Sequence, residues 1–416
     1  MTQVKSITQK KVVLISFLYD TELGGGAAVA VNQLAHALFE KSYQVSVITS
    51  WECGFVKTDV LDGIKVIRIP PMNLYWVGAK DRQSNSKKIL WQLIDIWNPF
   101  IYRITRQLIL NEEPEIVHSH KLRGLSPSIW SAAVSAGAKK IIHTCHDFEL
   151  LSPEGLFMGK IGILAQEQNL IMRPYQYLRR RFSRHVNDAT APSRFVLDYH
   201  KKMGFFPRAS NKVIHNSHGF NESGLDEVFS EASLLPKHNR AKYFLFLGRL
   251  DKTKGIECLC EAFSQFTSKF DEMRLRIAGS GPQEGYLREK YNRLTNIEFF
   301  GPVYGEQKEK LFKDSDVLIS PSQAPESFGI VIIEAFAHGL PVIASDIGAY
   351  PEIIREGETG LLVKPGSEKS LFSAMEKINK EKDLFWAMSQ NCFKESRKYT
   401  ITKLIKDYLD LYRDFQ

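Results

Sequence analysis

The segment PESFGIVIIEAFAHG carries two glutamates, Glu326 and Glu334, at the two ends of an apolar run. A carboxylate close to apolar side chains is unfavourable unless hydrogen bonds or cations stabilise its charge. The run predicts a helix that begins near Phe328, with Glu326 in the preceding loop. Eight residues turn a helix through about 800°, so the carboxylates would lie about 80° apart around its axis. Such carboxylates could accept hydrogen bonds from hydroxyls, and we expect Glu326 to hold a sugar and Glu334 a ribose.

A second segment, LFLGRLDKTKG, combines glycines with two cations. It places Arg249 and Lys254 in a loop after an apolar strand, beside Gly248. Cations at the carboxyl end of a strand suit a diphosphate, because opposite charges attract strongly where water is partly excluded. Backbone amides near Phe328 and Gly329 could add to this binding. The alternative for this fragment by itself is a solvated loop.

Three consecutive glycines, Gly24, Gly25 and Gly26, open a predicted helix after the first strand. Glycine lets the backbone approach a phosphate closely, and a helix N-terminus offers amides and partial positive charge. The dinucleotide fingerprint G-x-G-x-x-G has Val29 at its third glycine position, which disfavours a nucleotide-dependent oxidoreductase. A tight turn without a ligand is the alternative.

Histidines lie at the ends of two predicted strands, EIVHSH and KIIHTCH. We expect His118 and His120 to point to opposite faces of their strand, with His120 in the site and His118 in the core. At the end of the next strand, we expect His146, beside Asp147, to face the site and His143 to be structural. No cysteine or further carboxylate completes a metal site around them, so we expect no bound metal.

Apolar strands alternate with helical patterns in both halves of the chain. With 416 residues the chain is too long for one ordinary core, which predicts two domains. The strands are expected at 12–17, 44–49, 64–69, 115–120 and 140–145, and at 243–248, 275–279, 297–301, 316–321, 341–345 and 360–363. The alternation predicts an α/β fold with two doubly wound, Rossmann-like domains that face each other across a cleft.

We expect the N-terminal domain over residues 1–215, a linker region over 216–240 and the C-terminal domain over 241–400. The last helix, 401–416, is amphipathic and is expected to pack back toward the N-terminal domain. The stretch 72–110 is rich in Trp, Tyr, Arg and Lys and is expected to form an insertion with helices.

The charge is unevenly distributed. Residues 1–215 carry 28 Lys+Arg and 17 Asp+Glu, a net charge of +11, whereas residues 216–416 carry 27 and 30, a net charge of −3. A basic half suggests an anionic partner such as a membrane surface, although plain solubility is an equal alternative. The basic, aromatic stretch YLRRRFSRH (177–185) fits a membrane-facing helix or a solvated helix face, and no motif supports nucleic acid.

No apolar run is long enough to span a membrane, and the first residues lack the features of a secretory signal. The five cysteines include no metal-ligand spacing, which predicts reduced thiols without a disulfide framework. We expect a cytoplasmic protein, with a peripheral position at the inner face of the plasma membrane as a further expectation.

Several motifs resemble the retaining glycosyltransferases of family four, the group 1 enzymes with the GT-B fold. They are GRLDKTKG, IAGSGP, the paired glutamates in ESFGIVIIEAFAHGLPVIASD, GETGLLVKPGS, GGGAAVAVNQLAHAL, EIVHSH, HTCHD and APSRFV. Each motif is weak alone, but the combination is specific and covers nearly the whole chain. The stretches 72–110 and 150–180 match least, and such regions usually face the acceptor. The segment HNSHGF departs from the family, which more often has Asn-Gly where this chain has Asn216-Ser217.

The resemblance implies a role for each matching residue. Arg249 and Lys254 would bind the donor diphosphate, Glu326 the donor sugar and Glu334 the nucleotide ribose. His120 would lie near the sugar and the acceptor, either as a base or as a positioning group. The remaining expected contacts are Gly25, Gly26, Gly248, Phe328, Gly329 and Ile330 on the donor side, and His146 and Asp147 on the acceptor side.

The resemblance also implies the reaction. It is metal-independent transfer of a hexose, with retention, from a nucleoside-diphosphate sugar such as a UDP- or GDP-sugar, with no other cofactor. A glycan or a lipid-linked molecule is the expected acceptor, in assembly of a cell-surface polysaccharide or glycolipid. The alternatives are a synthase of a soluble glycoside and an inactive scaffold with the same fold; intact Arg249, Lys254, Glu326 and Glu334 argue against the scaffold.

Overall fold

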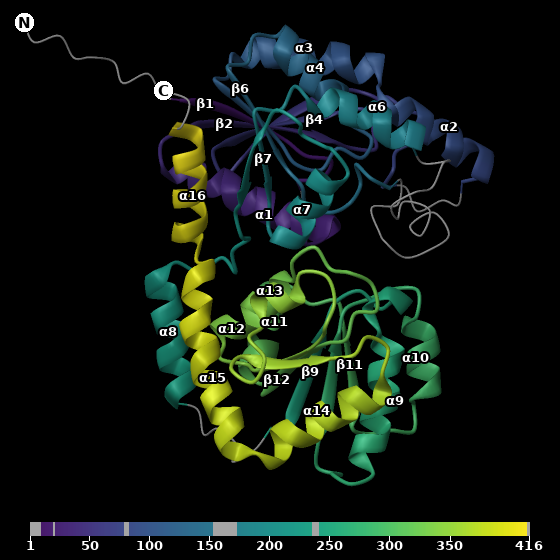
Figure 1. Cartoon of the computed structure of the whole chain (residues 1–416), viewed down its shortest axis with the longest axis vertical. Coiled ribbons are helices and arrows are strands. Elements are labelled where there is room, and N and C mark those ends of the chain that lie inside the picture. Colours follow the sequence, from purple (N-terminus) through teal and green to yellow (C-terminus); the bar gives the residue numbers. More distant parts are fainter. Residues whose placement is uncertain (1–9, 20, 79–82, 153–172, 235–240, 414–416) are drawn as a thin grey trace, which may run out of the picture. The chain divides into compact units, whose positions relative to one another are not determined.

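The computed structural model describes residues 10–19, 21–78, 83–152, 173–234 and 241–413 (Figure 1). The chain forms two compact units. The first unit comprises Met1–His215 and Leu404–Gln416, and the second comprises Asn216–Lys403. Each unit contains one sheet and its own apolar core.

The sheet of the first unit has the strand order β3-β4-β2-β1-β5-β6-β7-β8. All neighbours are parallel except β3 and β4. Its strands are β1 (Lys11–Ile15), β2 (Gln44–Ser50), β3 (Lys57–Leu61), β4 (Ile64–Ile69), β5 (Ile116–Ser119), β6 (Lys140–Thr144), β7 (Asp188–Ala191) and β8 (Ser210–Val213). Its helices are α1 (Thr21–Glu40), α2 (Asn85–Ile96), α3 (Pro99–Glu112), α4 (Ser128–Ser135), α6 (Arg173–Ser183) and α7 (Arg194–Lys202).

The sheet of the second unit is parallel throughout, with the order β11-β10-β9-β12-β13-β14. Its strands are β9 (Tyr243–Leu247), β10 (Arg274–Ala278), β11 (Ile297–Gly301), β12 (Val317–Ser320), β13 (Val342–Ser345) and β14 (Gly360–Val363). Its helices are α8 (Glu222–Leu234), η1 (Lys252–Lys254), α9 (Ile256–Thr267), α10 (Glu284–Lys290), α11 (Gly305–Lys313), α12 (Ile330–Ala337), α13 (Tyr350–Ile353), α14 (Glu368–Lys380), α15 (Lys382–Ser396) and η2 (Arg397–Tyr399). The chain then continues into α16 (Ile401–Arg413).

Apolar side chains cover the sheets as expected for a doubly wound fold. In the second unit, one core packs α9 and α14 against the sheet, and another packs α11 and α12 against it. The predicted class, two doubly wound α/β domains, is therefore confirmed, and each predicted strand has a counterpart. Among the described residues, no helix is long and apolar enough to cross a membrane.

Three strands of the first sheet were not predicted. β3 has the sequence KTDVL with exposed side chains and pairs antiparallel at the sheet edge. β7 has only DATA, and β8 at the other edge has SNKV. None of them forms an apolar run, because two are edge strands and β7 buries small or polar side chains.

Helix α8 occupies most of the stretch expected to link the domains. Its Leu225 and Val228 are buried, and Phe229 contacts the ring of Phe393 in α15 with centroids 4.6 Å apart. Asp226 also pairs with Arg397. The linker prediction is wrong for this helix, which packs on the second unit, whereas residues 235–240 lie outside the described part of the chain.

Helix α16 supplies side chains to the first unit. The Tyr412 hydroxyl lies 2.8 Å from His118 Nδ1, and the Tyr408 hydroxyl lies 3.2 Å from Thr144 Oγ1. Lys140 Nζ, in β6, donates to the Leu411 carbonyl and pairs with Asp188 Oδ2 at 3.1 Å. Its side chain is only 4% exposed, so a carboxylate from β7 and a carbonyl from α16 satisfy a buried ammonium.

Candidate active site

The loop after β9 holds both predicted cations in a fixed turn. Asp251 accepts a hydrogen bond from Arg249 Nε and another from the Thr253 amide at 2.8 Å. This anchors one edge of the guanidinium while the Arg249 side chain stays 61% exposed. The loop therefore presents the terminal nitrogens of Arg249 outward.

Glycines bring this loop against its neighbours backbone to backbone. A Cβ atom on Gly279, where φ is +135°, would lie 1.9 Å from the Gly248 carbonyl oxygen. A Cβ atom on Gly255, where φ is +68°, would lie 2.0 Å from the Pro321 carbonyl oxygen. Both positions therefore require glycine. The second contact places Lys254 beside the loop that follows β12.

Lys254 and Glu326, predicted from separate motifs, meet in the structure. Lys254 Nζ lies 2.6 Å from Glu326 Oε1, and the Ser322 hydroxyl donates to the same oxygen at 2.6 Å. The Glu326 side chain is 18% exposed. The carboxylate is thus charge-paired and hydrogen-bonded, but still accessible at the carboxyl edge of the sheet.

Helix α12 begins at Ile330, directly after Gly329. Gly329 has φ +108°, and a Cβ atom there would lie 2.7 Å from Tyr350 Cε1. No side chain caps this helix, so its first amides remain oriented toward the loop that carries Glu326. Phe328, by contrast, is 2% exposed and belongs to the core, so its expected contribution is limited to its backbone.

Glu334 is held by a residue that the sequence analysis missed. Lys308 in α11 donates to Glu334 Oε1 at 2.6 Å, and the Glu334 side chain is 13% exposed. Burial raises the pKa of Glu334, and the ammonium of Lys308 acts against that rise. Each glutamate of the opening pair therefore has its own lysine. Lys308 lies in a polar segment, GEQKEKLFK, where no pattern singles it out.

The glycine-rich segment of the first unit lies where two helical stretches meet, and the longer stretch begins directly after Gly25. Helix α1 runs from Thr21 to Glu40 with a break at Gly25, where φ is 60° and ψ is −161°. This conformation is almost confined to glycine. A Cβ atom there would meet no atom within 4 Å, so the requirement comes from the backbone alone.

His118 and His120 lie on the same side of their strand, contrary to the prediction. Their ring centroids are 4.1 Å apart. The prediction was wrong because side chains alternate between faces, so residues two positions apart share a face. His118 bonds Tyr412 and Thr144 within the core, as expected of a structural residue.

His120 and His146 form a hydrogen-bonded pair at the end of β5 and β6. His120 Nδ1 lies 3.0 Å from His146 Nε2, and His120 Nε2 has no partner among the described residues although it is buried. Burial and the neighbouring His118 hold the pKa of His120 well below its usual value, and burial lowers that of His146 to about 4. Both rings are therefore neutral at pH 7 and can exchange hydrogen bonds with hydroxyls.

Asp147 is already paired. Lys121 Nζ lies 2.7 Å from Asp147 Oδ2, and the Glu149 amide donates to Oδ1 at 2.9 Å. Burial alone would raise the pKa of Asp147, but Lys121, the Glu149 amide and His146 together lower it. Glu149 was missed, although its spacing from Asp147 in HDFEL was visible. Burial and the Asp147 charge raise the pKa of Glu149 to about 7.

A buried ion pair connects the surroundings of these residues. Arg179 Nη2 in α6 lies 2.6 Å from Asp95 Oδ2 in α2, and both side chains are at most 2% exposed. Arg179 Nη1 also donates to the Glu149 carbonyl at 3.0 Å, and the Gly124 amide donates to Asp95 Oδ1 at 3.0 Å. The pair thereby joins two helices to the loops that follow β5 and β6.

The buried histidines predict that the protein loses stability in mild acid. Burial lowers the pKa of five histidines in the first unit whose side chains are fully enclosed: His118, His120, His143, His146 and His200. An unfolded histidine has a pKa near 6.5, so below about pH 6.5 the unfolded chain binds protons that the folded chain does not. Each histidine then removes up to about 1.4 kcal/mol of stability per pH unit until its folded pKa is reached.

Two carboxyls change the stability in the opposite direction. Burial raises the pKa of Glu149 to about 7 and that of Asp95 to about 6, so in mild acid the folded chain binds protons there that the unfolded chain does not. Five histidines outweigh two acids, so urea unfolding should show a lower free energy at pH 5.0 than at pH 7.5. His200→Gln should make this dependence shallower. Equal stability at both pH values would show that the histidines are not held neutral.

No group of three or more potential metal ligands occurs among the described residues.

Comparison with known proteins identifies the class. The family model for glycosyl transferases group 1 matches residues 231–398, and the model for glycosyltransferase family 4 matches residues 24–217. The chain belongs to the group 1 glycosyltransferases, of the family 4 type, with the GT-B fold.

Two relatives resemble the chain over most of its length. An uncharacterised 42.6 kDa protein in the cps region of Klebsiella pneumoniae is 28% identical over 347 residues, covering 83% of this chain and 87% of that protein. The phosphatidyl-myo-inositol mannosyltransferase of Mycobacterium leprae is 26% identical over 359 residues, covering 86% and 84%.

Solved structures share the fold. Sucrose-phosphate synthase from Thermosynechococcus elongatus has a TM-score of 0.74 at 20% identity, covering 98% of this chain and 99% of that one. The Anabaena protein HepE, solved in complex with UDP, has a TM-score of 0.67 at 17% identity, covering 98% and 100%.

Proposed function

We propose that this glycosyltransferase moves a hexose from a nucleoside-diphosphate sugar to an acceptor hydroxyl, with retention and without a metal ion. The observation that carries the proposal is the cluster at the carboxyl edge of the second sheet. There Lys254 and Ser322 hold Glu326, while Arg249 projects from the adjoining loop. Cations next to an accessible carboxylate match a ligand that is anionic at one end and rich in hydroxyls at the other.

In this proposal, Arg249 and Lys254 bind the diphosphate. The reaction breaks the bond between the sugar and the diphosphate, so negative charge develops on the leaving phosphate. Fixed cations aimed at that charge lower the barrier, because they need no reorganisation during the step. Lys254 has three N–H donors, so it can bind a phosphate oxygen while it keeps Glu326 in place.

Glu326 then accepts hydrogen bonds from the donor sugar, and Glu334 from the ribose. The amides of Gly329 and Ile330 face the donor, and Gly25, Gly26 and Gly248 give the backbone close access to it. On the acceptor side, His120 and His146 are neutral and orient the attacking hydroxyl, with Asp147 held by Lys121.

The choice of donor and biological role rests on relatives. HepE is solved with UDP, which supports a nucleotide-sugar donor of the UDP or GDP type. The mycobacterial relative is named for a lipid acceptor, and the Klebsiella relative for the cps region. Together with the basic first half of the chain, they support a glycan or lipid-linked acceptor, cell-surface glycan assembly and work at an anionic membrane surface on the cytoplasmic side.

A thermal-shift screen of UDP-, GDP-, ADP- and CDP-sugars tests the donor assignment. At about 100 times its dissociation constant, the correct donor should add roughly 2.7 kcal/mol of stability. Glu326→Ala should weaken this shift, because the donor sugar loses its acceptor group. Glu289→Ala, which removes an exposed glutamate from α10 of the same unit, is the matched control and should respond like the wild type.

A shift with one nucleotide class, reduced only in Glu326→Ala, would support the donor and the role of Glu326. A shift unchanged in Glu326→Ala would remove that role. Folded protein that responds to none of the four donor classes would argue against the nucleotide-sugar proposal.

A further inference from the structure

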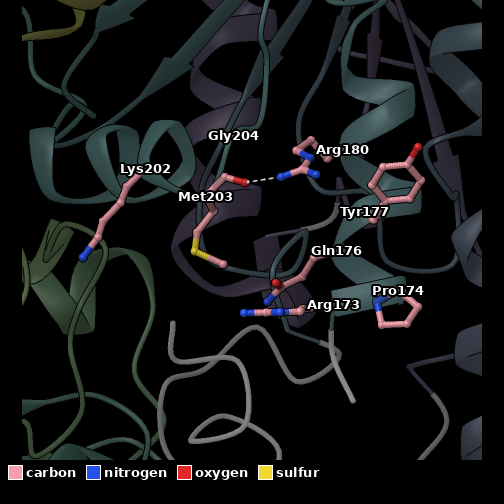
Figure 2. A pocket seen from close by; sticks show the side chains of 8 residues that line it. All are labelled: Arg173, Pro174, Gln176, Tyr177, Arg180, Lys202, Met203 and Gly204. Carbon is pink, nitrogen blue, oxygen red and sulfur yellow. Dashed lines mark hydrogen bonds between the residues drawn. The ribbon is translucent and has the colours of Figure 1, made fainter. Parts of the chain in front are cut away.

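A pocket of about 580 Å³ lies between α6 and the end of α7 in the first unit. Arg173, Gln176, Tyr177 and Arg180 line it from α6, and Lys202 and Gly204 from the other side (Figure 2). Among the described residues, none of the side chains that line it is a carboxylate. Figure 2 shows the ends of Arg173 and Gln176 close together, whereas Lys202 points away from both arginines. Arg173 and Arg180 are therefore the cations that are positioned to contact a ligand within the pocket.

Arg180 is held in position by uncharged neighbours. Its guanidinium lies over the ring of Tyr177, with 5.6 Å to the centroid, and its Nη1 donates a long hydrogen bond of 3.4 Å to the Met203 carbonyl. Gly204 has φ +77°, and a Cβ atom there would lie 3.1 Å from both Cδ and Nη1 of Arg180. Glycine at this position thus gives the guanidinium room against the backbone. A guanidinium has five N–H donors, so most of its donors remain available to a ligand.

Several arginines elsewhere in the described residues lie against an acidic side chain, whereas these two do not. Arg68, Arg179 and Arg249 each lie against an aspartate, and Arg355 and Arg397 each pair with an acidic side chain. Within the described part of the chain, neither Arg173 nor Arg180 forms an ion pair. The two are seven residues apart, which places them on one side of α6 about 10 Å apart along its axis. Guanidinium groups so arranged favour an anion that offers several oxygens.

Exposed apolar side chains lie on the same helix and on the helix packed against it. Tyr177 and Leu178 of α6 are 55% and 40% exposed. In α2, which is joined to α6 by the Asp95–Arg179 ion pair, Ile89, Leu90 and Leu93 are 63%, 50% and 58% exposed. Tyr177 itself lines the cationic pocket, and an apolar ring beside cations matches a ligand with a phosphate and an apolar part, which is the chemistry of a lipid headgroup region.

We propose that the pocket between α6 and α7 binds a phosphate group, through Arg173 and Arg180. The phosphate belongs either to an anionic lipid at a membrane surface or to a phosphorylated soluble molecule. The proposal does not depend on the donor or on the transfer reaction, because binding here can be measured without turnover.

The test compares the double variant Arg173→Gln/Arg180→Gln with Lys139→Gln/Arg293→Gln, which removes the same charge from two exposed positions elsewhere. One arm measures co-sedimentation with phosphatidylglycerol vesicles, against phosphatidylcholine vesicles as the uncharged surface. The other arm titrates inorganic pyrophosphate by calorimetry, with Arg249→Gln and Lys254→Gln added to every protein compared, so that neither cation assigned to the donor site contributes. Loss of two charged contacts should weaken binding about tenfold or more, with little change in the control.

If Arg173→Gln/Arg180→Gln loses binding to the vesicles alone, the ligand is a lipid phosphate. If it loses binding to pyrophosphate alone, the ligand is a soluble phosphorylated molecule. Loss in both arms supports the site for either source. Equal weakening of binding by the two double variants would overturn the proposal, because it would show that the probes are attracted by net charge only. The proposal would also be overturned if the protein without the pocket substitutions bound neither probe. Thermal unfolding checks the fold of each variant, and the single Arg173→Gln, at an exposed position, gives a second measurement if the double variant is unstable.

Discussion

Lys254→Gln is expected to lower turnover by about 100- to 1,000-fold while the protein stays folded. In the proposed mechanism, the ammonium of Lys254 stabilises charge on the leaving diphosphate and holds Glu326 at 2.6 Å. Loss of one preorganised group that stabilises transition-state charge typically has an effect of this size. Steady-state kinetics with the donor identified by thermal shift would measure kcat and KM separately, and the fall should be mainly in kcat.

Lys252→Gln provides the control, because Lys252 is exposed in the same short helix, η1, and pairs with no carboxylate among the described residues. It should retain nearly all activity. If Lys254→Gln and Lys252→Gln have similar turnover, the ion pair with Glu326 is structural and the assignment of Lys254 to the diphosphate is wrong.

Asp95→Ala is expected to destabilise the protein by about 3–5 kcal/mol. The substitution leaves the guanidinium of Arg179 buried without its carboxylate, and an unpaired buried charge is far more costly than an absent pair. Urea unfolding followed by circular dichroism at pH 7.5 would measure the loss. Since unfolding of a two-unit chain can proceed in steps, the transition of the first unit is the one expected to shift.

The double variant Asp95→Leu/Arg179→Met separates charge from packing. Removing both charges together should restore much of the stability lost in Asp95→Ala, because hydrophobic side chains of similar volume can replace a buried pair. A double variant less stable than Asp95→Ala would contradict this account and would indicate that the hydrogen bonds of Arg179 to the Glu149 carbonyl matter more.

The fold could be predicted where strands are buried on both faces. Strands such as β1, β9 and β12 bury continuous apolar runs, and those runs are visible in the sequence. Strands β3 and β8 were not predicted, because an edge strand needs no continuous apolar run. Helix α8 was not predicted, because its apolar face around Leu225 and Val228 is narrow and the residues on either side are mostly polar.

The site could be predicted only in part. The motifs identified Lys254 and Glu326, but their ion pair depends on Gly255 allowing two distant loops to touch. Lys308 and Arg179 could not be found, because each acts through a partner far away in the chain, Glu334 and Asp95. The positions of His118 and His120, by contrast, could have been predicted correctly, because the two-residue period of a strand already places both residues on one face.

The place of α16 in the first unit has a consequence for synthesis. Residues 216–403 are made between the rest of that unit and the helix that completes it. At about 5–20 residues per second, this interval lasts roughly 10–40 s. During it, His118 and Thr144 lack the hydroxyls of Tyr412 and Tyr408, and Lys140 lacks the Leu411 carbonyl. The first unit to emerge from the ribosome is therefore the last to be finished.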